Sequence, residues 1–165
     1  MKKTLLLAIL CLMLSAPQLQ AAEHRIGGGA NYWVAIDDID TDNIDDNGIS
    51  IFGSYQYWAG LFGLEFDVDL LPDRFGETAF APEAYVLVGR AIYAGVGIGI
   101  TYSDGDFADE PFYALKAGIN LELLPDIYVD IFANYHFNDS AEFDNLKEKI
   151  DTDTVFLGAA VRFSL

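Results

Sequence analysis

Charged residues recur at alternate positions along several stretches of the chain, where they could pair with one another. Glu65, Asp67 and Asp69 alternate with apolar residues in one stretch. Six further charged residues take equivalent positions elsewhere: Arg25, Glu83, Lys116, Glu122, Asp130 and Arg162. An unpaired charge is unfavourable inside a protein, so these residues should form one charge network if they share an interior. Such a network could line a path for ions or protons, or it could only hold the structure together.

An aspartate-rich stretch offers a candidate metal site. Asp38, Asp40 and Asp42 have the spacing with which a calcium-binding EF-hand loop begins. Asn43 replaces the glycine of such a loop, however, and Ile49 replaces its last glutamate. We therefore expect a solvated acidic loop and no cofactor, with weak calcium or magnesium binding by these aspartates as the alternative.

The elements that must position these residues are β-strands, because side chains alternate between the two faces of a strand. The last twelve residues show the pattern most clearly. One face carries an unbroken apolar stripe: Val155, Leu157, Ala159, Val161, Phe163 and Leu165. Eight such stretches follow one another, at about residues 25–36, 49–57, 61–71, 83–89, 92–102, 113–123, 127–137 and 154–165. Pro82 lacks the N–H that a central strand needs, so the fourth strand should start after it or contain a bulge there.

Most of these stretches have 9–12 residues, close to the ~9–11 that a tilted strand needs to cross a membrane. Three connections are short and four are longer, the longer ones at residues 37–48, 72–78, 103–111 and 138–153. The last of these could contain one helical turn near residues 145–149. The longer connections hold 18 of the 26 acidic residues, and no acidic residue falls on an apolar face. Both features indicate a membrane-spanning sheet, because a charge facing the middle of the bilayer is unfavourable.

The N-terminus has the features of a secretory signal. Lys2 and Lys3 precede the apolar residues 5–14, and small residues follow at 21–22. We expect residues 1–22 to be removed and residues 23–165 to form one domain. That domain has 7 basic and 26 acidic residues, a formal net charge of −19, which argues against nucleic acid as a partner. Cys11 is the only cysteine, so the domain would contain no disulfide.

The chain resembles the small eight-stranded outer-membrane β-barrel family, which includes the OmpA transmembrane domain and OmpX. The resemblance rests on the strand lengths, on the division of the connections into short and longer ones, and on the apolar stripe of the last strand. The resemblance implies an all-β fold: an eight-stranded antiparallel up-and-down transmembrane β-barrel. It also implies a monomer exported to the outer membrane of a Gram-negative cell. Phe163 and Leu165 would then be the signal read by the barrel assembly machinery, although this family usually ends in Phe or Trp.

The barrel interpretation predicts a structural or surface-interaction role and no enzymatic activity. Outer-membrane lipid and lipopolysaccharide would be the partners, with divalent cations as bridges to the acidic loops. Inward-facing glycines, such as Gly97, Gly118 and Gly158, should leave room for large side chains to fill the interior. A narrow porin-like channel for ions or solutes is one alternative. A lipid A-modifying enzyme using His136 with Ser140 and Glu142 is another, but the His-x-Ser-Asn arrangement of such enzymes is absent.

Overall fold

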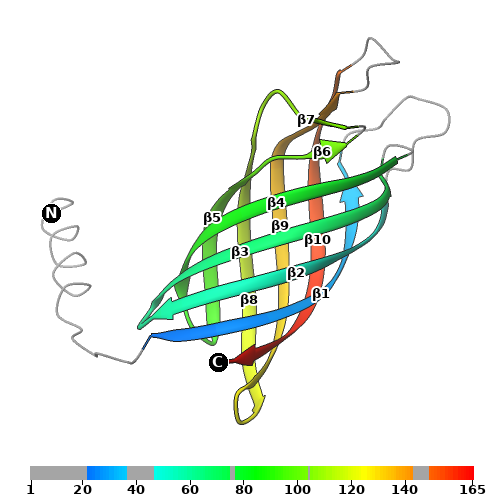
Figure 1. Ribbon diagram of the computed structural model, residues 1–165. Helices are drawn as coiled ribbons and strands as arrows, with labels where there is room; N and C mark the ends of the chain where they lie inside the picture. Colours follow the sequence, from blue (N-terminus) through cyan, green and yellow to red (C-terminus); the bar gives the residue numbers. More distant parts are fainter. Residues whose placement is uncertain (1–21, 37–46, 75–76, 104, 143–148) are drawn as a thin grey trace, which may run out of the picture.

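The computed structural model describes residues 22–36, 47–74, 77–103, 105–142 and 149–165, which form a closed β-barrel (Figure 1). Eight strands make its wall: β1 (Glu23–Ala35), β2 (Asn47–Ala59), β3 (Phe62–Arg74), β4 (Glu77–Gly89), β5 (Ile92–Gly99), β8 (Phe112–Leu124), β9 (Ile127–Glu142) and β10 (Lys149–Ser164). Two short strands, β6 (Tyr102–Ser103) and β7 (Asp106–Phe107), form a small hairpin beyond β5. The predicted eight-stranded antiparallel up-and-down barrel is confirmed.

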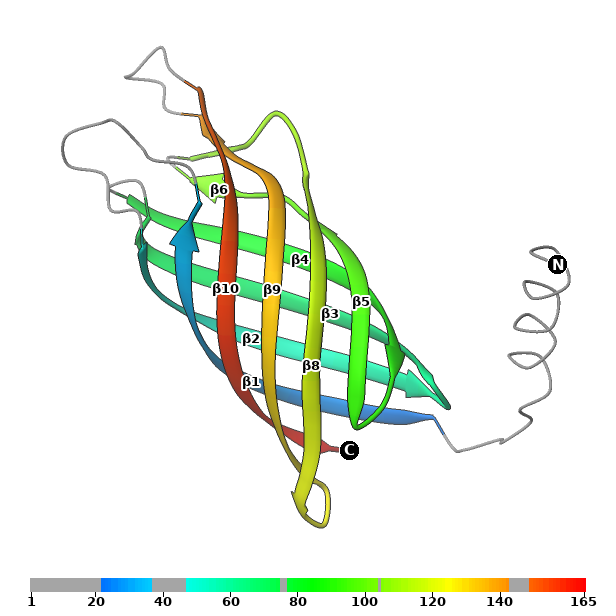
Figure 2. The ribbon, with the colours of Figure 1, turned by 180° about the vertical axis from the view of Figure 1, so that it is seen from behind.

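Every strand of the wall pairs antiparallel with its neighbours in the sequence, and β1 pairs with β10 to close the ring. This last ladder is continuous from Arg25 opposite Ser164 to Ala35 opposite Thr154. Figure 2 shows the closed wall from the other side. A closed ring leaves no open sheet edge within the wall, as a strand structure needs when no water is available to its backbone.

The connections differ between the two ends of the barrel. Three hairpins at one end turn within two residues, and the positive φ values of Gly60 (64°) and Asp126 (65°) suit such tight turns. β1 begins and β10 ends at this same end, which we call the turn rim and which lies lower in Figure 1. The opposite end, the loop rim, carries the β6–β7 hairpin and the other connections.

Several strands at the loop rim are longer than the sequence indicated. Residues 72–74 and 77–78 belong to β3 and β4, so most of the expected loop 72–78 is strand. Residues 138–142 and 149–153 likewise belong to β9 and β10. The expected helical turn near 145–149 lies outside the described residues, except for Lys149, which is in a strand. The register shifts at Leu71/Arg74 and at Thr152/Thr154, and such irregularities interrupt the alternation by which a strand is recognised.

Pro82 lies inside β4, contrary to the expectation that the strand starts after it or bulges there. The β3–β4 register is continuous through Val68 opposite Pro82. The wall strand on the other side is interrupted instead, because β5 ends at Gly99 and β6 begins at Tyr102. The Pro82 carbonyl still accepts a hydrogen bond from the Ile100 nitrogen at 3.2 Å. The missing N–H of Pro82 therefore faces the one place where its neighbouring strand is broken.

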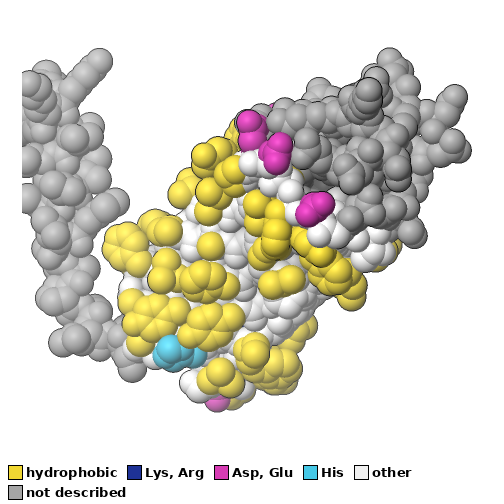
Figure 3. Space-filling view, turned by 45° about the horizontal axis from the view of Figure 1, so that its top comes forward, with side chains coloured by type: hydrophobic (Ala, Val, Ile, Leu, Met, Phe, Trp, Pro, Cys, Tyr) yellow, Lys and Arg dark blue, Asp and Glu magenta, His cyan; other side chains and the backbone are white. Residues whose placement is uncertain are grey.

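The apolar face of each strand points outward. Val86, Val96 and Leu115 lie side by side on β4, β5 and β8 and are 50%, 59% and 49% exposed. Tyr85 and Leu87, next to Val86 in the chain, are buried inside the barrel. In Figure 3, apolar side chains cover the outer wall and the visible carboxylates lie near its ends. The charged residues buried in the molecule all belong to the inward-facing set, as a wall in contact with lipid requires.

Inward-facing glycines make room for large side chains from other strands. A Cβ on Gly97 would stand 2.3 Å from the Tyr85 ring, and one on Gly158 would stand 2.4 Å from the Phe132 ring. Gly53, which faces outward, would meet nothing within 4 Å. The expectation that glycines allow rings to fill the interior is met at these inward positions, where any larger residue would collide with a neighbour.

Candidate functional site

The charged interior is the main candidate site. Eight charged side chains are buried there, and the list matches the sequence prediction except for one member: Arg25, Glu65, Asp67, Asp69, Glu83, Lys116, Asp130 and Arg162. Alternation along β3 places its three carboxylates on the inner wall, while β8 and β10 supply a lysine and an arginine. The alternation along each strand therefore determines which charged side chains face the interior. The arrangement of the strands around the barrel determines which of these side chains contact one another.

Arg162 is at the centre of the network. Its guanidinium donates to Asp130 through Nη1, to Glu65 Oε1 through Nη2 at 2.5 Å, and to the Ser54 hydroxyl through Nε at 3.1 Å. Ser54 donates in turn to Glu65 Oε1 at 3.2 Å. The Tyr93 hydroxyl lies 3.0 and 2.9 Å from the two carboxylate oxygens of Asp130. Arg162 thus joins two carboxylates that belong to different parts of the wall.

Lys116 is the second cation of the network. Its Nζ lies 2.8 Å from Asp67 Oδ2 and 3.2 Å from Glu65 Oε1. It also lies 4.3 Å from the ring centre of Phe132 and 4.7 Å from that of Tyr85, within the range of cation–π contacts. Carboxylates and ring faces therefore surround the ammonium group and hold it in place.

The part of the interior nearer the loop rim has a different composition. Glu83 stands opposite Asp67 on the neighbouring strand and accepts a hydrogen bond from the Tyr85 hydroxyl. Its other partner is His136, whose Nε2 lies 3.6 Å away. Asn134 Nδ2 donates to the Tyr85 hydroxyl at 2.6 Å and lies 2.8 Å from His136 Nε2. No lysine or arginine nitrogen of the described residues lies within 4 Å of Glu83, so hydrogen bonds take the place of ion pairs here.

Apolar side chains close the interior on both sides of the charges. One cluster near the loop rim comprises Trp33, Leu71, Ala79, Ala81, Phe112 and Phe156. The His136 ring packs against this cluster. It is stacked on the Phe112 ring, with the ring centres 4.3 Å apart, and it is tilted against the Phe156 ring at 4.4 Å. The second cluster includes Trp58, Leu87 and Tyr93 nearer the turn rim. Large buried side chains therefore occur at every height, as expected for eight strands, whose interior is just wide enough for side chains.

A smaller ionic group lies at the turn rim. Glu23 accepts from Arg25 Nε at 2.7 Å and from Arg90 Nη2 at 2.5 Å. The Arg25 guanidinium carbon lies 3.5 Å from the ring centre of Tyr128. Sequence reasoning missed Glu23 and Arg90, because it placed the first before the first strand and the second in a turn. It also missed Tyr93 as a partner of the charges, although its inward position opposite Gly118 was a usable signal.

Glu122 does not join the buried network, so its assignment to the interior charges was wrong. The alternation along β8 places Glu122 on the inward face, but the strand reaches the turn rim there and the side chain is exposed. Its Oε1 accepts a hydrogen bond from the Asp126 backbone at 3.3 Å. Asp38, Asp40 and Asp42 lie outside the described residues. Among the residues that the structure describes, no group of three or more His, Cys, Asp or Glu side chains could hold a metal ion.

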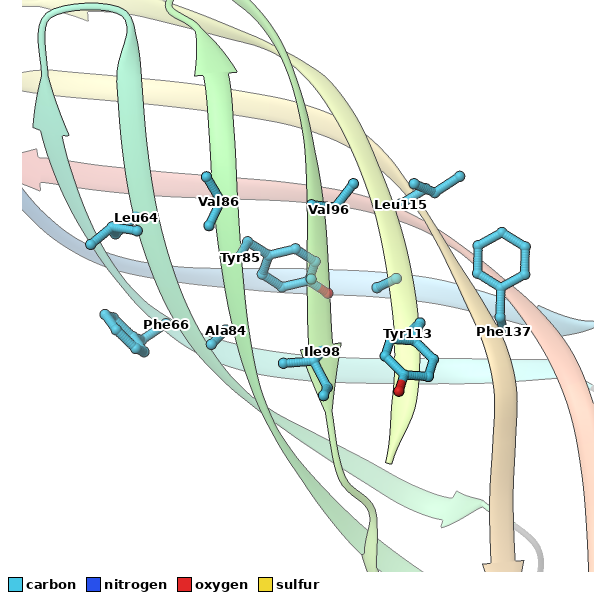
Figure 4. Close-up of a pocket in the computed structure, with 12 residues that line it drawn as sticks. Leu64, Phe66, Ala84, Tyr85, Val86, Val96, Ile98, Tyr113, Leu115 and Phe137 are labelled. Atoms are coloured by element: carbon cyan, nitrogen blue, oxygen red, sulfur yellow. The ribbon is translucent and has the colours of Figure 1, made fainter. Parts of the chain in front are cut away.

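The outer wall carries an apolar groove of about 560 Å³. Figure 4 shows the outward side chains around it, which come from β3, β4, β5, β8 and β9: Leu64, Phe66, Val86, Val96, Ile98, Tyr113, Leu115 and Phe137. Ala84 and Gly97 leave its floor low, and the buried Tyr85 ring lies beneath. The groove contains no charged side chain, so it suits the acyl chains of a bilayer.

The family model for the outer membrane protein beta-barrel domain matches residues 4–163, almost the entire chain. No curated protein sequence matches significantly. Among the described residues, no helix is long and apolar enough to cross a membrane.

Solved structures with a similar fold include Neisserial surface protein A, with a TM-score of 0.66 and 12% identity over 88% of this chain and 100% of that chain. The outer membrane protein AlkL, solved in lipid bilayers, has a TM-score of 0.54 and 12% identity over 92% and 93% of the two chains. The N-terminal β-barrel domain of Pseudomonas aeruginosa OprF has a TM-score of 0.51 and 12% identity over 87% and 98%. At these identities the likeness concerns the fold alone.

Proposed function

The chain belongs to the outer membrane protein β-barrel family, and we propose that it is a closed, non-conducting barrel with a structural or surface-interaction role. The observation that carries this proposal is the filled interior. Arg162 and Lys116 hold three carboxylates between them, and apolar clusters lie on both sides. Open water-filled porins have about 16–18 strands, whereas eight strands enclose little more than their own side chains.

The β9–β10 hairpin supports a role at the cell surface. Its ladder continues to Lys149 opposite Glu142. The neighbouring ladders end lower, at Ala35 opposite Thr154 and at Tyr113 opposite Phe137. Among the described residues, no third strand pairs with this upper part of the hairpin. Its backbone edges can therefore receive an extended segment of another protein by strand addition.

We assign the loop rim to the outside of the cell and the turn rim to the periplasm, since these barrels have short periplasmic turns and longer outer loops. The acidic connections would then face lipopolysaccharide. Divalent cations can bridge the phosphates of lipopolysaccharide to the carboxylates of these connections. Phe163 is 50% exposed on the last strand, between Ile26 and Ile127. Phe163 and Leu165 would provide the apolar end that the barrel assembly machinery binds, and a monomer is sufficient for each of these roles.

Planar-bilayer recording tests the proposal. Purified protein should give no steady conductance at neutral pH, because opening a path requires that several buried ion pairs separate together. Asp67→Asn should leave the membrane equally impermeable, since Lys116 keeps Glu65 as a partner. A reproducible conductance in the unmodified protein, with an ion selectivity that shifts in Asp67→Asn, would make the molecule a channel and the proposal wrong.

A further inference from the structure

The outward face of the wall carries one histidine near the turn rim. His24 is exposed at the start of β1, and alternation places it on the same face as Ile26, which is 51% exposed. Among the described wall residues that face outward near this rim, the others are apolar, glycine or tyrosine. An imidazole forms hydrogen bonds, so it needs a polar partner on a wall that otherwise contacts acyl chains.

His24 lies directly below the apolar band of the wall. Ile36 follows Ile26 by ten positions, and the outward residues from one to the other include no charged side chain. Ten positions of an extended strand rise ~34 Å, which is ~24–28 Å across the membrane at a tilt of ~35–45°. The apolar band of such barrels is ~25 Å tall. His24, the next outward residue toward the turn rim, is therefore at the level of the lipid headgroups.

Two half-buried tyrosines of β2 hold the imidazole in place. Tyr57 stands directly opposite His24, with the ring centres 5.1 Å apart. The Tyr55 hydroxyl lies 2.6 Å from His24 Nδ1. When this hydroxyl donates, the ring proton is on Nε2, which then becomes a hydrogen-bond donor. Within the described part of the chain, neither His24 Nε2 nor the Tyr57 hydroxyl has a hydrogen-bond partner, so two donors are available at one place.

The outward polar pair at the loop rim has the opposite character. There the Tyr135 hydroxyl donates to Asp153 Oδ2 at 2.7 Å. A carboxylate accepts hydrogen bonds and repels an anion, whereas an imidazole N–H and a phenol hydroxyl donate to one. Of these two pairs, the one at the turn rim therefore suits direct contact with a phosphate group.

We propose that His24 and Tyr57 bind the phosphate group of one phospholipid, whose acyl chains lie along the apolar wall. His24 Nε2 and the Tyr57 hydroxyl donate hydrogen bonds to the phosphate oxygens. Tyr55 is a positioning residue that fixes the imidazole. The orientation proposed above places this phospholipid in the periplasmic leaflet, whereas the binding itself does not depend on that orientation.

The test uses the full barrel domain in maltoside micelles, which contain no phosphate. Native mass spectrometry counts the lipids bound per barrel as dioleoylphosphatidylglycerol is added. We expect saturable binding of one lipid. Dioleoylglycerol lacks the phosphate and inorganic phosphate lacks the acyl chains, so each should bind at least about tenfold more weakly.

Variants of exposed and half-buried residues identify the donors. His24→Phe keeps a ring but no N–H and should weaken phosphatidylglycerol binding about tenfold, whereas His24→Gln keeps an N–H donor and should recover most of the affinity. Tyr57→Phe should weaken binding about threefold. Tyr32→Phe removes another outward hydroxyl of β1, one that contacts Asn47 at 3.4 Å, and should leave binding unchanged.

Tyr55→Phe tests the positioning role. Nitrogen NMR of His24 should show one fixed tautomer, with the proton on Nε2, in the unmodified protein and an average of two tautomers in the variant. A merely structural contact would leave the tautomer unchanged in Tyr55→Phe, which would remove Tyr55 from the site.

Three results would overturn the proposal. The first is dioleoylglycerol binding as tightly as the phospholipid, which would reduce the contact to acyl chains. The second is inorganic phosphate binding as tightly, which would make the site a simple anion contact. The third is unchanged phospholipid affinity in His24→Phe, which would place the binding elsewhere. None of these results depends on conductance, so the closed barrel is tested separately.

Discussion

Glu65 and Glu83 are buried carboxylates on the inner face of neighbouring strands, but their surroundings differ. Glu65 contacts two cations, Arg162 at 2.5 Å and Lys116 at 3.2 Å. Glu83 contacts the Tyr85 hydroxyl and lies 3.6 Å from His136. The same contrast separates the two halves of the interior. Ion pairs organise the described contacts toward the turn rim, whereas a hydrogen bond and stacked rings surround Glu83 and His136 toward the loop rim.

This difference indicates which half should resist change. Removing one partner of a buried ion pair leaves the other charge without compensation, which destabilises a protein by ~3–5 kcal/mol. Losing one hydrogen bond costs less, about 0.5–1.5 kcal/mol between neutral groups and about 1.5–3 kcal/mol when one group is charged. Substitutions in the turn half should therefore be severe, and comparable substitutions in the loop half should be mild.

The largest effect is expected for Arg162→Met. It removes the cation of Asp130 and one of the two cations of Glu65, so the free energy of unfolding should fall by about 3–5 kcal/mol. Urea unfolding in lipid vesicles measures this change. Arg90→Met is the matched control, because its pair with Glu23 is partly exposed and should contribute less than ~1 kcal/mol. Equal effects of the two variants would break the comparison.

The pair Glu65→Gln and Glu83→Gln tests the two halves with the same chemical change. Glu65→Gln leaves two cations without their shared carboxylate and should destabilise by ~3 kcal/mol or more. Glu83→Gln keeps an acceptor for Tyr85 and removes a like charge opposite Asp67, so its effect should stay below about 1 kcal/mol. Unfolding midpoints of both variants, measured under identical conditions, decide the matter. A larger loss for Glu83→Gln would reverse the assignment of the halves.

A smaller effect is expected for Gly97→Ala, which sharpens the description of the loop half. The new Cβ would collide with the Tyr85 ring at 2.3 Å and should cost about 1–3 kcal/mol. Gly53→Ala changes an outward glycine with nothing within 4 Å and should be neutral or stabilise by ~0.5–1 kcal/mol. Near-ultraviolet circular dichroism should report the displaced tyrosine only in Gly97→Ala. A destabilised Gly53→Ala with an unaffected Gly97→Ala would contradict the inward packing.

The alternation of residues predicted the direction of side chains well. Val96 faces outward and Lys116 faces inward because a strand has a period of two, and this period depends on no distant contact. Strand ends were predicted less well. β9 and β10 continue beyond the expected boundary because a register shift between Thr152 and Thr154 interrupts the alternation while the backbone pairing goes on.

Partners within the interior could not be read from the pattern. Arg162 and Asp130 are 32 positions apart in the sequence, and their contact depends on how the strands are staggered around the barrel. Asn120 and Glu122 have the same inward parity, but one is buried and the other exposed. The alternation of residues gives the face of the strand on which a side chain lies. Whether an inward-facing side chain is buried depends on its distance from the rim, and the position of the rim follows only from the closed barrel.

A pair of double-mutant cycles tests most directly whether ion pairs hold the turn half of the interior while hydrogen bonds hold the loop half. One cycle combines Arg162→Met with Glu65→Gln, and the other combines His136→Phe with Glu83→Gln. We expect a coupling energy of at least about 1.5 kcal/mol for Arg162 and Glu65, as for close buried charge pairs. We expect less than ~0.5 kcal/mol for His136 and Glu83. Equal coupling in the two cycles, or stronger coupling in the loop half, would contradict this division of the interior.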